Sequence, residues 1–322
     1  MNGIITVSLS PVIDIHYSAD NFIVGKDNIV KSRHVFAAGK AMNVSRGLHA
    51  VGISAETHIL LGEENASEYL RLASDYAVPI SCITTDGAVR ENISVNTPKG
   101  ETRICLNNYS ITPNILPVFA AKIISKLSEN MAVVFSGSLP KGITCADFVK
   151  FVLTIKNAVP NTKIVLDCPT LNSEHIKKIQ PFLIKPNYEE ALKLLNNLNF
   201  AGFTAEDKKD AENAAKTLCI HTESSYCVIS CGASGAAFAS KNGDSGYINA
   251  PKINNIACST VGAGDSMLAG MLFSFLKENS LHRCTISEAV KWGVAFGSAA
   301  CLNKGTEPPI AANIFKLYRE IN

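Results

Sequence analysis

Apolar residues form two kinds of pattern along the chain. The run from Gly3 to Leu9 is almost continuously apolar, which predicts a buried strand. From Ala41 to Val51 the apolar residues recur on one helical face and Gly52 follows, so a helix is predicted there. Residues 13–36 mix polar, β-branched and aromatic residues without a helical period. They are predicted to form strands and loops outside the compact part of the chain.

The segment 89–107 has the pattern of a β-hairpin. Its residues alternate, turn at Thr97–Gly100 and return as a second strand. If Thr97 pairs with Gly100, Arg90 and Arg103 project from the same face. From these residues alone, two solvated arginines on an exposed strand face are the favoured interpretation, and a phosphate site is the alternative.

Beyond residue 131 short apolar runs alternate with helical patterns. This alternation predicts a mostly parallel sheet with helices on both faces, which is an α/β fold. Strands are predicted at 132–135, 164–167, 182–184, 227–230, 236–239 and 247–249, and helices at 146–156, 188–196, 207–218, 265–276 and 287–302. Since no linker or repeat interrupts the chain, residues 1–322 are predicted to form a single domain, with the segments 13–36 and 89–107 as a small lid.

Composition excludes several classes of function. The net charge is +2 without a basic run, so no nucleic acid or membrane partner is expected. The chain starts without a signal-like segment, and its ten cysteines are scattered, so reduced thiols in a cytoplasmic protein are expected. Neither a P-loop motif nor a zinc-like or hydrolase-like grouping of histidines is present.

The residues around Gly262 and Gly264 predict a glycine turn that leads into a helix. Glycines let main-chain amides approach a ligand, and a helix N-terminus attracts an anion. Asp265 adds a carboxylate at this place, where it would repel a phosphate. A base that serves a neighbouring hydroxyl explains this conflict, and a helix cap beside a tight turn explains it equally well when the motif is taken alone.

Two motifs resemble the signatures of a known family. The sequence STVGAGDSM at 259–267 resembles the second signature of the ribokinase-like (PfkB) sugar kinases, and AGKAMNVSR at 38–46 resembles the first. Similar segments at 136–140, 185–187 and 230–235 extend the resemblance over nearly the whole chain. Within the family, the chain is most similar to the hexose-phosphate kinases, the group of the 1-phosphofructokinases, tagatose-6-phosphate kinases and minor 6-phosphofructokinases.

The resemblance implies an ATP-dependent kinase that phosphorylates a ketohexose monophosphate, either fructose 1-phosphate or tagatose 6-phosphate. Asp265 would take the proton from the sugar hydroxyl. The amides of the turn before it would stabilise the transferring phosphoryl group, and they belong to Gly262, Ala263 and Gly264. Implied contacts to sugar hydroxyls come from Asp14, Gly39 and Asn43, and implied contacts to the substrate's own phosphate from Lys40, Arg90 and Arg103.

The resemblance also implies a site for ATP and Mg²⁺. The matching nucleotide positions are Lys185, Asn187, Ser230, Gly232, Ser234, Gly235, Gly264 and Asn303. Asn187 and Glu190 match an N-x-x-E element that acts on magnesium and phosphate, although an N-cap with a capping-box glutamate is the local alternative. Magnesium is expected to arrive with ATP and to keep several waters.

Three further expectations complete the reading of the sequence. Ala41 stands where these kinases usually have a glycine, so a methyl group is expected in the sugar pocket and the identity of the sugar stays open. A homodimer through the lid strands is expected, because pairing would cover their free edges. The alternatives are a kinase of an unphosphorylated sugar or nucleoside, and a non-catalytic sugar-phosphate sensor on the same fold.

Overall fold

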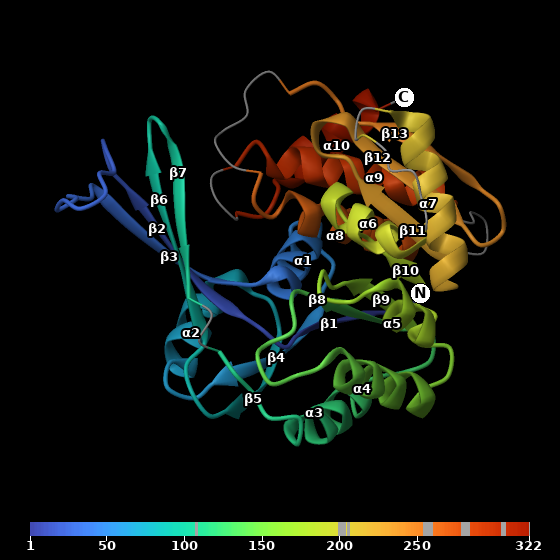
Figure 1. The fold of residues 1–322 in the computed structure, drawn as a ribbon, viewed down its shortest axis with the longest axis horizontal. Coiled ribbons are helices and arrows are strands. Elements are labelled where there is room, and N and C mark those ends of the chain that lie inside the picture. Colours follow the sequence, from blue (N-terminus) through green and yellow to red (C-terminus); the bar gives the residue numbers. More distant parts are fainter. Residues whose placement is uncertain are drawn as a thin grey trace.

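Two sheets, one of nine strands and one of four, organise the chain (Figure 1). The structure is a computed structural model that describes residues 1–106, 109–198, 204, 207–253, 260–277, 284–303 and 307–321. The strand end predicted at Ser259 lies outside these residues. Among the described helices, none is both long and apolar enough to cross a membrane.

The nine-stranded sheet is mostly parallel. Its order is β13-β12-β11-β10-β9-β8-β1-β4-β5, and antiparallel pairing occurs at β11–β12 and β12–β13. The strands are β1 Ile4–Ser8, β4 Glu56–Gly62, β5 Ile80–Thr85, β8 Ala132–Ser136, β9 Lys163–Asp167, β10 Leu183–Ile184, β11 Tyr226–Ser230, β12 Gly235–Ser240 and β13 Ser245–Asn249. The predicted mostly parallel sheet is therefore confirmed.

Helices cover both faces of this sheet, as predicted (Figure 1). One face packs on α3 Ile115–Ile124, α4 Cys145–Ala158, α5 Ser173–Ile179, α6 Tyr188–Leu195 and α7 Lys208–Thr222. The other packs on α1 Lys40–His49, α8 Ala263–Leu276, α9 Ile286–Ala300 and α10 Ala311–Glu320. Side chains alternate between the two cores along each strand, so Val133 and Phe135 enter the first core and Val134 enters the second. Burial on both faces explains the apolar runs of the sequence.

Glycines bring α8 and α9 into close contact. A Cβ atom on Gly270 of α8 would lie 2.6 Å from the carbonyl oxygen of Trp292 on α9. A Cβ atom on Gly297 of α9 would lie 3.1 Å from the carbonyl oxygen of Ala263, in the first turn of α8. On the other side of α8, a Cβ atom on Gly47 of α1 would come within 2.9 Å of the Ala269 Cβ. These contacts hold the first turn of α8 between two helices.

The small sheet contains β2 Val12–Ser18, β3 Ser32–Ala38, β6 Arg90–Thr97 and β7 Gly100–Cys105, in the order β3-β2-β6-β7. It extends from the body of the molecule beside α2 Ala66–Ala73 (Figure 1). Thr97 pairs with Gly100, so the hairpin has the register considered above. One face is apolar and packs on α2 and β4, whereas the other carries polar side chains.

Candidate active site

Four charged side chains meet near the carboxyl ends of β9 and β10. Asp167 ends β9, and Lys185 follows β10 directly. Lys40 begins α1 and Asp265 lies in the first turn of α8. The Lys40 Nζ atom lies 3.1 Å from Asp167 Oδ1, and the Lys185 Nζ atom lies 3.6 Å from Asp167 Oδ2. We call these four residues the charge cluster.

Asp265 has the properties of a general base. Its side chain is buried, and Oδ2 accepts a hydrogen bond of 2.8 Å from the Asn43 amide. Burial raises the pKa of Asp265 to about 6, and the neighbouring Asp167 carboxylate acts in the same direction. Lys40, Asn43 and Lys185 lower this pKa and limit the effect. A carboxylate with a pKa near the working pH is suited to accept a proton from a hydroxyl.

The turn before Asp265 presents main-chain amides. Gly262 has a φ of 81°, a left-handed conformation that favours glycine, and no side chain caps the helix that follows. A Cβ atom on Gly264 would lie 3.5 Å from Lys185 Nζ, so the ammonium group lies against this turn. The Ala263 amide donates to the Thr260 carbonyl at 3.2 Å. Helix dipole and ammonium together make the start of α8 attractive to an anion.

Asp167 is held ionised by its two cations. Burial alone would raise its pKa, but Lys185 and Lys40 outweigh burial and lower it. In return, Asp167 and Asp265 keep the pKa of Lys40 above its ordinary value although burial acts the other way. Asp167 and Lys40 are therefore charged near neutral pH.

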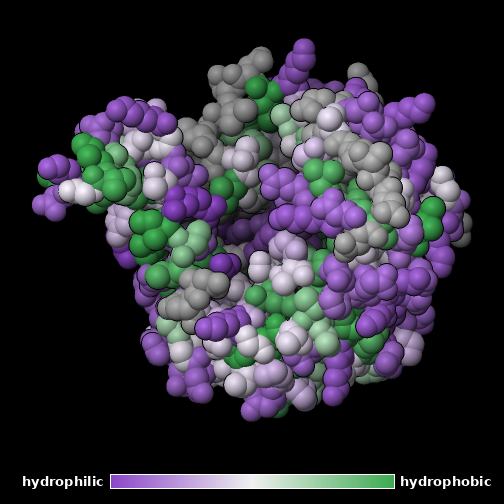
Figure 2. Space-filling model, in the orientation of Figure 1, coloured by the Kyte–Doolittle hydropathy of each residue, from purple (hydrophilic) through white to green (hydrophobic). Residues whose placement is uncertain are grey.

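The polar face of the small sheet carries the predicted substrate residues. Asp14 on β2 pairs with Asn92 on β6, and Arg90 pairs with Val12 in the neighbouring row. Arg90 and Arg103 both lower the pKa of Asp14, which burial raises, so the two guanidinium groups lie near this carboxylate. Figure 2 shows the surface hollowed between the small sheet and the body, with hydrophilic side chains along the hollow.

Three predicted substrate residues lie at the start of α1, namely Gly39, Lys40 and Asn43. Gly39 precedes the helix with a φ of 122° and links it to β3, a strand of the small sheet. Val12 of β2 pairs with Arg90 on one side and with Ala38 of β3 on the other. Gly39 follows Ala38, and Lys40 of the charge cluster follows Gly39. The substrate residues and the charge cluster are therefore neighbours. Ala41 is fully buried at the start of the helix.

Lys40, which is expected to hold the phosphate of the substrate, pairs with carboxylates in the structure. Its Nζ atom contacts Asp167 and lies 3.9 Å from Glu190 Oε1. A lysine between two carboxylates balances charge inside the cluster. Its contact to a substrate phosphate stays a prediction.

The predicted nucleotide residues surround a glycine loop after β11. Ser230 ends β11 and forms a bridge with Asn187. The loop continues through Gly232, with a φ of 57°, and Ser234 to Gly235. A Cβ atom on Gly235 would lie 2.0 Å from the Ile248 carbonyl oxygen, so only glycine fits there.

Asn303 lies after α9, where its side-chain amide donates to the Pro308 carbonyl at 2.7 Å. This contact shapes the local turn.

Asn187 and Glu190 form a capping box, which is the local alternative considered above. Asn187 Oδ1 accepts from the Glu190 amide at 2.8 Å, and Glu190 Oε2 accepts from the Asn187 amide at 2.9 Å. Glu190 Oε1 remains outside the box and points toward Lys40. The two interpretations are therefore compatible, since one carboxylate oxygen caps the helix and the other faces the charge cluster.

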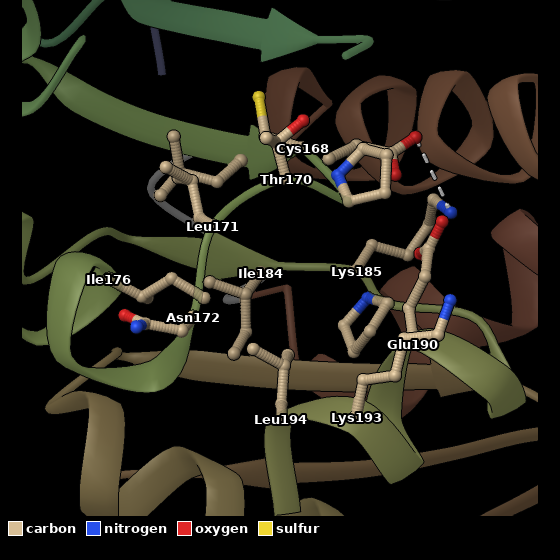
Figure 3. Close-up of a pocket in the computed structure, with 14 residues that line it drawn as sticks. Cys168, Thr170, Leu171, Asn172, Ile176, Ile184, Lys185, Glu190, Lys193 and Leu194 are labelled. Atoms are coloured by element: carbon tan, nitrogen blue, oxygen red, sulfur yellow. Dashed lines mark ion pairs between the residues drawn. The ribbon is translucent and has the colours of Figure 1, made fainter. Parts of the chain in front are cut away.

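A cavity of about 220 Å³ opens beside the charge cluster, between the turn after β9 and helix α6. Apolar side chains such as Ile176, Ile184 and Leu194 line its inner part (Figure 3). Lys185 and Glu190 lie together at its other end, where a dashed line marks the Asp167–Lys185 ion pair (Figure 3).

Two residues of the site were not identified from the sequence. Asp167 ends the apolar run of β9, and a charged residue at the end of a buried strand is a signal that could have identified it. Asn92 lies in the predicted hairpin and gave no local signal. Only the pairing of β6 with β2 brings it beside Asp14.

Comparisons with known proteins identify the family of the chain. The family model described as pfkB family carbohydrate kinase matches residues 4–313. A 1-phosphofructokinase of Escherichia coli (strain K12) is 30% identical over 287 residues, which cover 88% of each chain. A tagatose-6-phosphate kinase of Staphylococcus epidermidis is 27% identical over 303 residues, which cover 94% of this chain and 93% of the relative. The crystal structure of phosphofructokinase-2 from Escherichia coli has a TM-score of 0.85 at 23% identity, with 99% of both chains covered, and shows the same fold.

Together with the fold, these matches define a sugar kinase, an enzyme that transfers a phosphoryl group to an alcohol group. The chain belongs to the PfkB family of carbohydrate kinases. The family and the ribokinase-like fold predicted from the two signatures are thus confirmed.

The pH dependence of turnover should reveal the coupling between the two carboxylates. Asp265 accepts a proton only when ionised, so kcat should fall as the pH is lowered through about 6. Asp167→Asn removes a negative charge that raises this pKa, so the acid limb of kcat should move to lower pH. The measurement is kcat between about pH 5 and 8 for both enzymes, with Asp210→Asn on the exposed start of α7 as the control. An acid limb that stays in place or moves to higher pH in Asp167→Asn contradicts the coupling.

Proposed function

We propose that the protein transfers the terminal phosphoryl group of ATP to a ketohexose monophosphate. Fructose 1-phosphate is the first candidate substrate and tagatose 6-phosphate is the second. The observation that carries this proposal is the buried Asp265 carboxylate at the start of α8. It accepts a hydrogen bond from Asn43, and the ammonium groups of Lys40 and Lys185 lie nearby. The relatives named 1-phosphofructokinase and tagatose-6-phosphate kinase support the choice of substrates.

In this proposal, each part of the site performs one task. Asp265 accepts the proton of the sugar hydroxyl as the hydroxyl oxygen attacks. The amides of Gly262 and Gly264 and the Lys185 ammonium group stabilise charge on the phosphoryl group, and the Ala263 amide joins them once it leaves the Thr260 carbonyl.

The nucleotide side of the site takes ATP with Mg²⁺. The part of the chain that the structure describes contains no group of three His, Cys, Asp or Glu side chains placed to hold a metal. Glu190 Oε1 is an oxygen ligand outside the capping box, which suits Mg²⁺ contacted through water. When bound, the ion would neutralise phosphate charge. We assign the phosphates to the cluster side of the Ser230–Gly235 loop.

The protein is proposed to act in the cytoplasm. Every cysteine in the described part of the chain is a free thiol, as expected in a reducing compartment.

The base can be tested with Asp265→Asn, which keeps the shape of the side chain and removes its basicity. Turnover with the best substrate should fall by on the order of 10² or more, because general base catalysis is lost. Binding of the sugar phosphate, measured by calorimetry, should be retained. Near-normal turnover would remove Asp265 from this role.

The phosphate contacts can be tested with a panel of acceptors. Fructose 1-phosphate, fructose 6-phosphate, tagatose 6-phosphate and neutral sugars are compared in a coupled assay of ADP release. Arg90→Ala and Arg103→Ala should raise KM for the phosphorylated substrate about 10-fold, since each removes a charge-assisted hydrogen bond to phosphate. Arg33→Ala is the matched control, because Arg33 lies on the small sheet but on its opposite face. Turnover with neutral sugars or nucleosides alone would reject the ketohexose phosphate assignment.

The partner proposed for the small sheet is a second copy of the chain. β7 is an edge strand whose residues are all exposed, including Ile104 at 48%. Exposed apolar residues also lie on the β2–β3 loop, among them Val24 at 88% and Ile29 at 89%. Pairing of two small sheets would cover these groups.

Ile104→Lys should shift the protein from dimer to monomer, because it places a charge in the proposed contact. The masses are measured by light scattering at micromolar concentration. Ile220→Lys is the control, since Ile220 is 74% exposed on α7, outside the small sheet. A wild-type protein that is monomeric under these conditions would reject the dimer.

A further inference from the structure

Three buried oxygen atoms in the substrate half of the site have no hydrogen-bond donor among the described residues. They are Asp14 Oδ1, Asn43 Oδ1 and Asn92 Oδ1. The same region contains one unpartnered donor, the Arg90 Nε–H. Buried polar atoms normally have partners, since leaving them unpaired is costly. An excess of acceptors indicates a ligand that brings O–H donors.

Asn92 is central to this pattern. Its side chain is buried, with 8% exposure, and it faces the same side of the small sheet as Asp14 because the two residues are paired in the β2–β6 register. Neighbouring strands lie about 5 Å apart, so the two side chains are adjacent. Burial raises the pKa of Asp14, and the Asn92 side chain acts against this effect, as expected for an amide close to the carboxylate.

The free oxygen of Asn92 determines what this side chain can bind. An amide oxygen can only accept hydrogen bonds, and Asn92 Oδ1 is buried without a donor among the described residues. Asp14 Oδ1 beside it is also an acceptor. Two adjacent acceptors attract two hydroxyl groups and repel a phosphate, which offers no donor when ionised.

The rows on either side have the opposite chemistry. Along β6, the Asn92 row lies between the row of Arg90 and the row in which Ser94 pairs with Arg103. The acceptor pair is therefore flanked by the two guanidinium groups. A substrate with hydroxyls in its middle and a phosphate at one end matches this order of groups.

We propose that Asn92 is a specificity-determining residue that, together with Asp14, accepts hydrogen bonds from two neighbouring hydroxyls of the acceptor sugar. The identity of the sugar rests on the proposed function, whereas the requirement for two adjacent hydroxyls rests on the geometry of the pair. Asn92 also positions the Asp14 carboxylate. Asn92→Ala removes both effects.

The test compares wild type and Asn92→Ala on the best substrate of the acceptor panel and on its monodeoxy analogues. Asn92→Ala should raise KM for the parent substrate about 10-fold and leave kcat within about 3-fold, since the contact is made before and during the reaction. Wild type should discriminate by on the order of 10² in kcat/KM against the analogue that lacks the hydroxyl read by Asn92. In Asn92→Ala most of this discrimination should be lost for that analogue.

The matched control is Asn96→Ala, on the same strand and face but exposed at the far end of the sheet. It should keep the wild-type discrimination. Asn92→Leu, which fills the same space without polar atoms, is measured in the same way if the alanine variant does not fold. If the Asn92 variant discriminates against every monodeoxy analogue as wild type does, Asn92 reads no hydroxyl and the inference is overturned.

The two proposals can fail separately. If wild type phosphorylates a neutral sugar and no ketohexose phosphate, the proposed function is wrong. The loss of discrimination in Asn92→Ala, measured with the deoxy analogues of that neutral sugar, still decides the role of Asn92.

Discussion

The active site depends on the burial of one carboxylate, Asp167. A charge removed from water must be paired, because an unpaired buried ion costs several kcal/mol. Lys40 and Lys185 satisfy this requirement from α1 and from the end of β10, two elements far apart in sequence. The carboxylate thereby holds two ammonium groups beside the turn that begins α8. Asp167 also raises the pKa of Asp265, in the same direction as burial. The carboxylate that pairs with Lys40 and Lys185 therefore also influences the proton affinity of Asp265.

Close packing of helices gives this arrangement its precision. Asp265 occupies the first turn of α8, and that turn touches α9 at the Gly297–Ala263 contact. On the opposite side, Gly47 of α1 leaves room for α8, while Asn43 on the same helix binds Asp265. Positions without side chains thus let three helices approach, and the base, its hydrogen-bond donor and the amides are fixed together. Interiors packed at this density tolerate little displacement.

Sequence patterns predicted the parts of this structure whose signals are local. The apolar runs of β1, β8 and β9 and the periodic helices α1 and α4 gave a parallel sheet with helices on both faces. The segment 53–88, which forms β4, α2 and β5, carries no prediction from the sequence. The motif around Asp265 is local and was identified. Asp167 and Asn92 acquire their partners from contacts across the fold, such as the Lys40–Asp167 contact between residues 127 apart in sequence, and no local pattern reports those partners.

The distribution of polar groups gives the two sides of the site opposite chemistry. The side of the site near β9 and β10 is rich in cations and amide donors, which suit a phosphoryl group. The side beneath the small sheet is rich in buried acceptors, which suit hydroxyl groups. Asn43 lies at the boundary, because its amide binds Asp265 while its oxygen remains an acceptor. In the proposed reaction, a sugar hydroxyl that enters from the acceptor side would meet Asp265 and the start of α8 at the same point. Its proton would pass to Asp265, and the charge on the phosphoryl group would be stabilised by the cations and amides already in place.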